Sequence, residues 1–134
     1  MSILCEYYNA GDDDTDSLYS PRRQVQSFLA ASTHVLYSVK VKLYKSGTPT
    51  GTLTVGVYAV DASWHPTGSV LDSGTIDMAS LTTDTNGAWY EVVMTGNVSL
   101  SSGTRYAIQI TSSSSDTTNK GNWRCDSSSP TYTD

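Results

Sequence analysis

The chain has 134 residues, a formal net charge of −5 and only 8 Lys and Arg residues. This charge balance disfavours nucleic acid as a partner, because phosphate binding needs a concentrated basic surface. No apolar run approaches the length that spans a membrane. We expect one domain, residues 1–134, that is large enough to bury a core of its own.

The N-terminal part predicts a short strand from Leu4 to Tyr8 and then an acidic loop from Gly11 to Ser17. The first residues contain neither a basic leader nor an apolar core, so a cleaved signal peptide is not expected. A virion protein that assembles inside a host cell would need none.

The acidic loop holds the most conspicuous polar cluster, Asp12, Asp13, Asp14 and Asp16, of which Asp12, Asp14 and Asp16 alternate. Its alternating spacing superficially resembles a calcium loop, but an EF-hand needs Gly where the chain has Ser17 and Glu where it has Arg23. A looser calcium site built from the three carboxylates is one interpretation. A solvated loop that pairs with neighbouring arginines is the other.

Two strict period-two segments dominate the middle of the chain. Val39, Val41 and Leu43 alternate within an expected strand over 36–44, and Leu53, Val55, Val57 and Ala59 alternate within another over 53–60. Such alternation buries one face of a strand and leaves the other in water, which is typical of an antiparallel sandwich.

The remaining expected strands cover 25–29, 70–76, 89–94, 105–111 and 122–126, and a turn is expected at Pro66-Thr67-Gly68. Turn signals recur at intervals of about 8 to 12 residues, which is the spacing of an all-β sandwich or barrel. We therefore predict an all-β, antiparallel, jelly-roll-like sandwich of about eight strands.

The two cysteines, Cys5 and Cys125, lie near opposite ends of the chain. The first and last strands of a sandwich are often neighbours, so a disulfide between them is one interpretation. Closing so long a loop would contribute roughly 4 to 5 kcal/mol in the chain-entropy description. Two unpaired thiols are the alternative, because sequence cannot supply the Cα spacing that a disulfide requires.

Catalytic patterns are weak. His34 and His65 are too far apart for a zinc site of ordinary spacing, and no G-x-S-x-G segment is present. The carboxylates outside the acidic loop are scattered and no pair stands out. We expect no enzyme and, apart from the calcium alternative, no cofactor.

Aromatic residues are the better lead to function. Trp64 lies in a loop beside Asp61 and His65, where an indole can stack on a sugar ring or anchor a protein contact. The alternative is that Trp64 folds back and caps the end of the sandwich. Tyr44 and Tyr58 point away from the buried rows of their strands, so we expect them on exposed faces or against a neighbouring subunit.

A family resemblance rests on segments spread over nearly the whole chain. The segments are V-Q-S-F at 25–28, S-V-K-V-K-L-Y at 38–44, G-T-P-T-G-T-L-T-V at 47–55, H-P-T-G-S-V-L-D-S-G-T-I at 65–76, W-Y-E-V at 89–92, L-S-S-G-T-R-Y-A-I at 100–108 and W-R-C-D-S-S-S-P-T-Y-T at 123–133. Together they resemble a Ser/Thr/Gly-rich, jelly-roll-like β-sandwich domain of phage-associated and extracellular surface proteins, similar to carbohydrate-binding or adhesive modules. The resemblance implies no catalytic residues.

The similar domains usually continue after the P-T-Y-T segment with a further strand. A sandwich without that strand has an open sheet edge, which invites strand addition between subunits, unless the N-terminal strand covers it. We therefore expect a non-catalytic structural or adhesive module of a virion or extracellular surface, which works by protein–protein contacts in an oligomer or larger assembly. The alternative is a carbohydrate-binding module that uses Trp64, Asp61 and His65.

Overall fold

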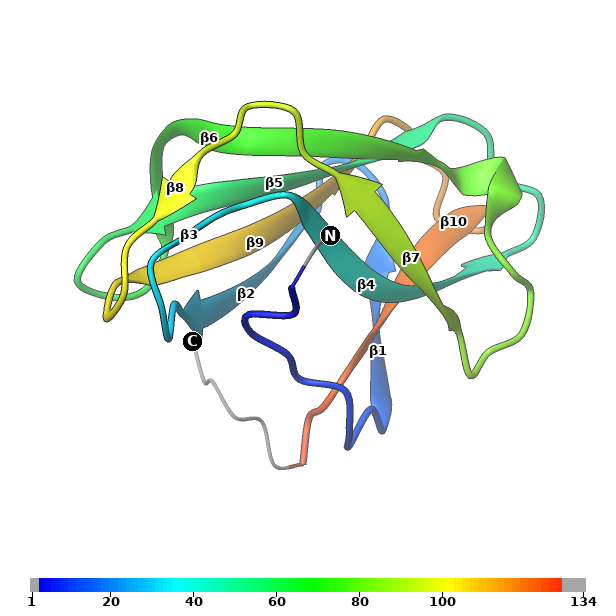
Figure 1. Cartoon of the computed structure of the whole chain (residues 1–134). Helices are drawn as coiled ribbons and strands as arrows, with labels where there is room; N and C mark the ends of the chain where they lie inside the picture. The colour runs from blue at the N-terminus through cyan, green and yellow to red at the C-terminus, as the bar shows by residue number, and fades with distance from the viewer. Residues whose placement is uncertain (1–2, 129–134) are drawn as a thin grey trace.

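The computed structural model describes residues 3–128 as two four-stranded antiparallel sheets packed face to face (Figure 1). The prediction of an all-β antiparallel sandwich is confirmed. Sheet A has the order β1-β10-β4-β7, sheet B has the order β2-β9-β5-β6, and β3 pairs with β8. The strands are β1 (Asp14–Leu18), β2 (Arg23–Leu29), β3 (His34–Val35), β4 (Ser38–Ser46), β5 (Thr52–Val60), β6 (Pro66–Asp77), β7 (Ala88–Val93), β8 (Ser99–Leu100), β9 (Arg105–Ser112) and β10 (Lys120–Cys125).

The strand pairs are nested around the β5–β6 connection. β5 pairs with β6, β4 with β7, β3 with β8, β2 with β9 and β1 with β10. Two further pairings, β4 with β10 and β5 with β9, join these pairs into the sheets. The chain is thus one long hairpin wound into two layers. The jelly-roll topology stays a prediction, and this nested order supports it.

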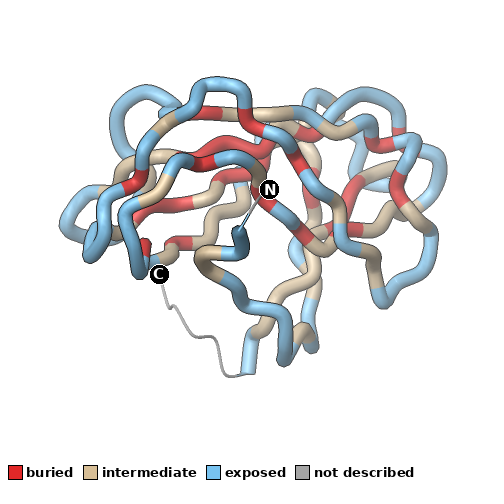
Figure 2. Tube along the Cα trace, viewed as in Figure 1, coloured by how far each residue is buried: buried red, intermediate tan, exposed pale blue. Residues whose placement is uncertain are grey.

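The core lies between the middle strands of the two sheets (Figure 2). The alternating residues of β4 and β5 point into it as predicted, and Leu43, Val55 and Val57 are completely buried. Each such side chain contributes roughly 1.5 to 3 kcal/mol to folding. Ile110 of β9 and Val92 of β7 complete the apolar layer from the two sheets.

The N-terminal third departs from the prediction. The expected strand from Leu4 to Tyr8 is wrong, because segment 3–10 has no strand conformation and no main-chain hydrogen bond joins it to the rest of the described chain. The acidic loop is wrong in part, since Asp14–Leu18 forms β1 along the edge of β10. With β1 and the short β3–β8 pair, the described residues form ten strands instead of about eight.

The connection between β5 and β6 also differs from the turn expected at Pro66-Thr67-Gly68. Its turn precedes the expected Pro-Thr-Gly segment, because β6 already begins at Pro66. The chain reverses over Asp61–Trp64, and the Asp61 carboxylate accepts hydrogen bonds from the main-chain N–H groups of Ser63 and His65 at 2.8 and 3.0 Å. An Asp side chain that bonds main-chain groups just ahead of it is a common way to stabilise such a turn.

Within residues 3–128 the helical structure is confined to the three-residue turn η1 (Met78–Ser80), so no helix there is long and apolar enough to cross a membrane.

Candidate functional site

Sheet A divides into two parts at β4. β10 pairs with β4 over four positions only, Lys120–Trp123 against Leu43–Ser46, and then runs away from it together with β1 (Figure 1). The first half of β4, Ser38–Lys42, pairs with β7 on one side. On the other side it receives no main-chain hydrogen bond from any described residue. This half of β4 is therefore a free strand edge.

A groove of about 1710 Å³ opens at this division and reaches between the sheets. Its inner wall carries Phe28 of β2, Ile108 of β9 and Trp123 of β10, all partly buried against the core. Segment 3–10 lies at its mouth and, in the view of Figure 1, runs across the opening between β2 and the β1–β10 pair. The groove is therefore a continuation of the core that the two sheets leave open.

Exposed apolar side chains gather around this groove. Twelve large hydrophobic residues in the described chain are exposed, and eight of them line it. Contiguous exposed apolar surface of this kind marks an interaction site more often than a bare solvent face. The eight residues are Ile3, Leu4, Tyr7, Tyr8, Leu29, Val35, Tyr37 and Trp89.

Among the described residues, side-chain contacts hold segment 3–10 at the mouth. One carboxylate oxygen of Glu6 accepts the main-chain N–H of Ala31 at 2.8 Å, and the other lies 3.5 Å from Nε2 of His34. The Tyr8 hydroxyl donates to the carboxylate of Asp126. The apolar side chains of the segment stay in water, with Ile3 81% exposed. The segment is therefore tied to the body of the domain without being packed into it.

The groove also holds both cysteines. Cys5 and Cys125 are free thiols in this structure, so the disulfide considered above is not formed in it. Burial, together with the charges of Asp16 and Asp14 across the β1–β10 ladder, raises the pKa of the Cys125 thiol to about 11. This thiol is therefore protonated at neutral pH and a poor nucleophile.

The three aspartates of the acidic segment do not converge. Asp12 binds Nζ of Lys42 at 2.9 Å and lies 3.4 Å from Nε of Arg124, and the Lys42 ammonium is the main reason that the pKa of this carboxyl lies below its usual value. Asp14 and Asp16 alternate with Thr15 along β1, on the face toward the groove. Across residues 3–128 no three His, Cys, Asp or Glu side chains are grouped to hold a metal ion.

Trp64 lies beside the outer face of sheet B. Its indole is 41% exposed, and the guanidinium of Arg105 lies over the ring. Nδ1 of His65 is 3.9 Å from the Asp61 carboxylate, so the structure brings these three predicted residues together in one turn. Tyr58 stands opposite Ala107 in the ladder, two positions from Arg105 and on the same outer face.

Tyr44 lies on the other side of the molecule. It is on the outer face of sheet A, and its hydroxyl approaches Oγ1 of Thr15 at 3.5 Å. The five predicted contact residues therefore do not form one site.

Trp89 was not among them, although it is 48% exposed and lines the groove. Glu91 lies two positions further along β7 and therefore on the same face as Trp89. Its charge is the sequence feature that predicts exposure of this face to solvent.

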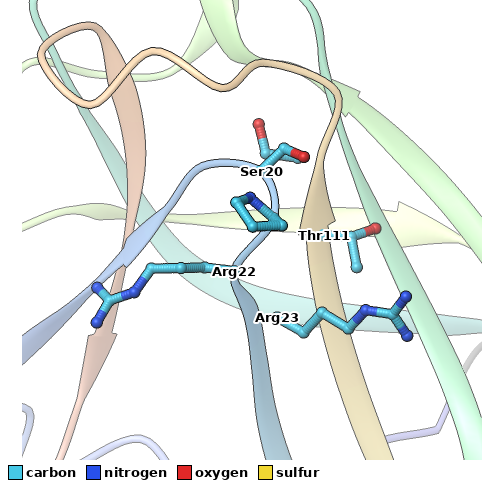
Figure 3. A pocket seen from close by; sticks show the side chains of 6 residues that line it. Ser20, Arg22, Arg23 and Thr111 are labelled. Carbon is cyan, nitrogen blue, oxygen red and sulfur yellow. The ribbon is translucent and has the colours of Figure 1, made fainter.

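A second, smaller hollow of about 260 Å³ lies at the turn between β1 and β2, against the end of β9 (Figure 3). Ser20, Arg22, Arg23 and Thr111 line it, and the two arginine side chains point away from each other. Arg22 instead lies over the ring of Tyr19, 5.4 Å from its centroid. The cations do not converge on one ligand position.

The chain matches no protein-family model, and no curated protein is similar to it in sequence.

Proposed function

We propose that the protein is a non-catalytic structural or adhesive module that works by protein–protein contact, and that the open groove is its contact surface. The observation that carries this proposal is the gathering of eight of the twelve exposed large hydrophobic residues around one opening of the sandwich. Burying apolar surface at about 25 cal/mol per Å² drives most protein association, so this opening is the strongest source of binding energy on the described surface.

The partner is a second copy of the same chain. Each copy carries the groove together with an exposed apolar segment at its mouth, so two copies supply both halves of the contact. The free edge of Ser38–Lys42 adds main-chain groups that an incoming strand can pair with. Self-association of this kind suits a subunit of a virion or an extracellular surface assembly, which is the location we propose.

Sedimentation over a wide range of protein concentration tests the proposal. We expect the chain to associate, and we expect Val35→Ser with Tyr37→Ser to weaken association, because both side chains are more than half exposed and line the groove. Val70→Ser with Leu71→Ser is the matched control, since these exposed residues lie on β6 away from the groove. A chain that stays monomeric at every concentration would contradict the proposal.

Carbohydrate binding is the second candidate, and the exposed Trp64 indole favours it. Arg105 lies over the ring and the Asp61 carboxylate already binds two main-chain N–H groups, so a sugar would have to use the uncovered part of the indole together with His65. A glycan array with the native chain and Trp64→Ala tests this function. Retention of a glycan that Trp64→Ala abolishes would support it, and an array with no bound glycan would remove it.

A further inference from the structure

The imidazole of His34 lies where segment 3–10 meets the body of the domain, and it lines the groove together with Glu6. Nδ1 of His34 is 2.9 Å from the main-chain oxygen of Ser32, and Nε2 is 3.5 Å from the Glu6 carboxylate. Both neighbours of the ring are hydrogen-bond acceptors. A neutral imidazole carries one N–H group, whereas a charged imidazolium carries two. The neutral ring can therefore donate to only one of these neighbours, and the charged ring can donate to both.

The pair of His34 and Glu6 is largely removed from solvent. The two side chains are 16% and 19% exposed. The other histidine–carboxylate pair of the described chain, His65 and Asp61, has a separation of 3.9 Å and side chains that are 69% and 49% exposed. Water and salt screen exposed charges more than partly buried ones. Protonation should therefore change the strength of the His34 pair more than that of the His65 pair.

We propose that His34 is a pH-sensitive latch, which holds segment 3–10 at the mouth of the groove when its imidazole is charged and loosens the segment when it is neutral. The bond from Tyr8 to Asp126 involves no histidine, so the latch acts on the part of the segment around Glu6. The inference goes beyond the proposed function, because it concerns the attachment of the segment and holds whatever binds in the groove.

Glu6 is the charged residue that the described part of the chain places against His34. The other elements packed here are the turn at residues 31–33, the loop at 101–103 that binds this turn, and β8, where Leu100 stands opposite His34. None of them carries a histidine or a charged residue. Cys5 and Tyr7 flank Glu6, and thiols and phenols ordinarily titrate above the range of about pH 5 to 8 in which histidine changes charge. A change in attachment over this range is therefore assigned to His34.

The second contact of Glu6 makes the latch measurable. Its other carboxylate oxygen accepts the main-chain N–H of Ala31 at 2.8 Å, and this amide has no main-chain acceptor among the described residues. When the pair with His34 weakens, the carboxylate leaves the amide more often. The protection of the Ala31 amide against hydrogen exchange therefore reports the fraction of molecules in which the segment is attached.

NMR exchange rates of the Ala31 amide at about pH 5.5 and about pH 7.5, each divided by the intrinsic rate at that pH, test the latch. We expect the protection in the native chain to fall about twofold to fivefold as the pH rises, which is the effect of one ion pair near the surface. Glu6→Gln keeps an oxygen for the amide but has no charge, so its protection should not change with pH. His65→Gln is the matched control and should behave like the native chain.

Equal protection of the Ala31 amide at both pH values in the native chain would overturn the latch. A pH dependence that persists in Glu6→Gln would also overturn it, and so would one that disappears in His65→Gln, since another group would then be responsible. Glu6 lies in a segment that is not packed into the core, so Glu6→Gln tests the contact without a threat to folding. The measurement is made in dilute solution and does not require association, so its result is separate from that of the proposed function.

Discussion

The guanidinium carbon of Arg105 lies 4.1 Å from the centre of the Trp64 indole ring. Arg105 opens β9, and its Nη1 also donates to the Ser27 hydroxyl of β2 at 3.3 Å. The stacked pair therefore ties the β5–β6 turn to the outer face of sheet B. Arg105 covers one side of the Trp64 indole, so this residue packs against the body of the domain there, while its contact with a sugar or a protein stays a prediction.

Removing this stack should loosen the turn. A cation over an indole contributes about 0.5 to 1 kcal/mol at an exposed site, so we expect Trp64→Ala to lower the free energy of unfolding by about that amount. Trp64→Phe should retain part of it. Urea denaturation measures the difference. Equal stability of the native chain and Trp64→Ala would contradict a structural contribution from the stack.

Acid should weaken the attachment of residue 12 to sheet A. The Lys42 ammonium, helped by Arg124, lowers the pKa of Asp12 from its usual value of 3.8, against an opposing effect of burial. A carboxyl with a lowered pKa in the folded state stabilises the fold above its unfolded pKa, and that stabilisation disappears as the pH falls through the folded pKa.

We therefore expect the stability difference between the native chain and Asp12→Asn to be full above about pH 5 and to disappear as the pH falls from 3.8 through the lowered folded pKa of Asp12. Thermal unfolding at several pH values measures this difference. A difference that stays constant from pH 7 to pH 2 would show that Asp12 acts through packing instead of charge.

Alkylation should be slow at Cys125. A pKa of about 11, against 9.0 for an ordinary thiol, leaves about a hundredth of the usual thiolate at neutral pH. A more basic thiolate is also more reactive, so the net rate with iodoacetamide should fall about tenfold below that of Cys125 in the urea-unfolded chain. Mass spectrometry of the labelled peptide reports the rate. Equal rates in the folded and unfolded chains would contradict the burial of this thiol.

A side chain at Gly74 should strain the contact between β6 and β7. A Cβ atom there would lie 2.5 Å from Cγ1 of Val92 and 2.7 Å from the main-chain oxygen of Val93. Overpacking of this kind lowers stability by about 1 to 3 kcal/mol, so we expect Gly74→Ala to reduce the free energy of unfolding by that amount. The neighbouring Ser73→Ala, on the outer face of β6, is the control and should change it by less than about 0.5 kcal/mol.

The sequence predicted the parts of this fold that depend on local alternation. Side chains alternate between the two faces of any strand, whatever the strand order in the sheet. The shared face of Val39, Val41 and Leu43 could therefore be predicted from their spacing alone. The same logic failed for β1, since Asp14 and Asp16 are poor strand formers. They adopt a strand because β10 pairs with them, and their charges are tolerated because that face of β1 borders an open groove.

The candidate site was harder to predict because it depends on distant pairings. The groove exists because β10 leaves β4 after Trp123, and no feature of either strand alone shows where their pairing ends. The position of Arg105 over Trp64 likewise joins two residues that are far apart in the sequence. Sequence correctly placed Trp64, Asp61 and His65 in one loop, because a loop is a local feature.

The nested strand order also has a consequence for how the chain folds. The β5–β6 pair closes a short loop, whereas Asp14 can meet Cys125 only after nearly the whole chain has been drawn together. Closing distant contacts is slow, and domains with many of them fold in about milliseconds to seconds. If pairing proceeds outward from β5–β6, β4 pairs with β7 early, and its other edge stays open until β10 reaches Leu43–Ser46 late in folding. If the self-association proposed above takes place, newly made chains at high concentration would then meet through this edge before folding is complete.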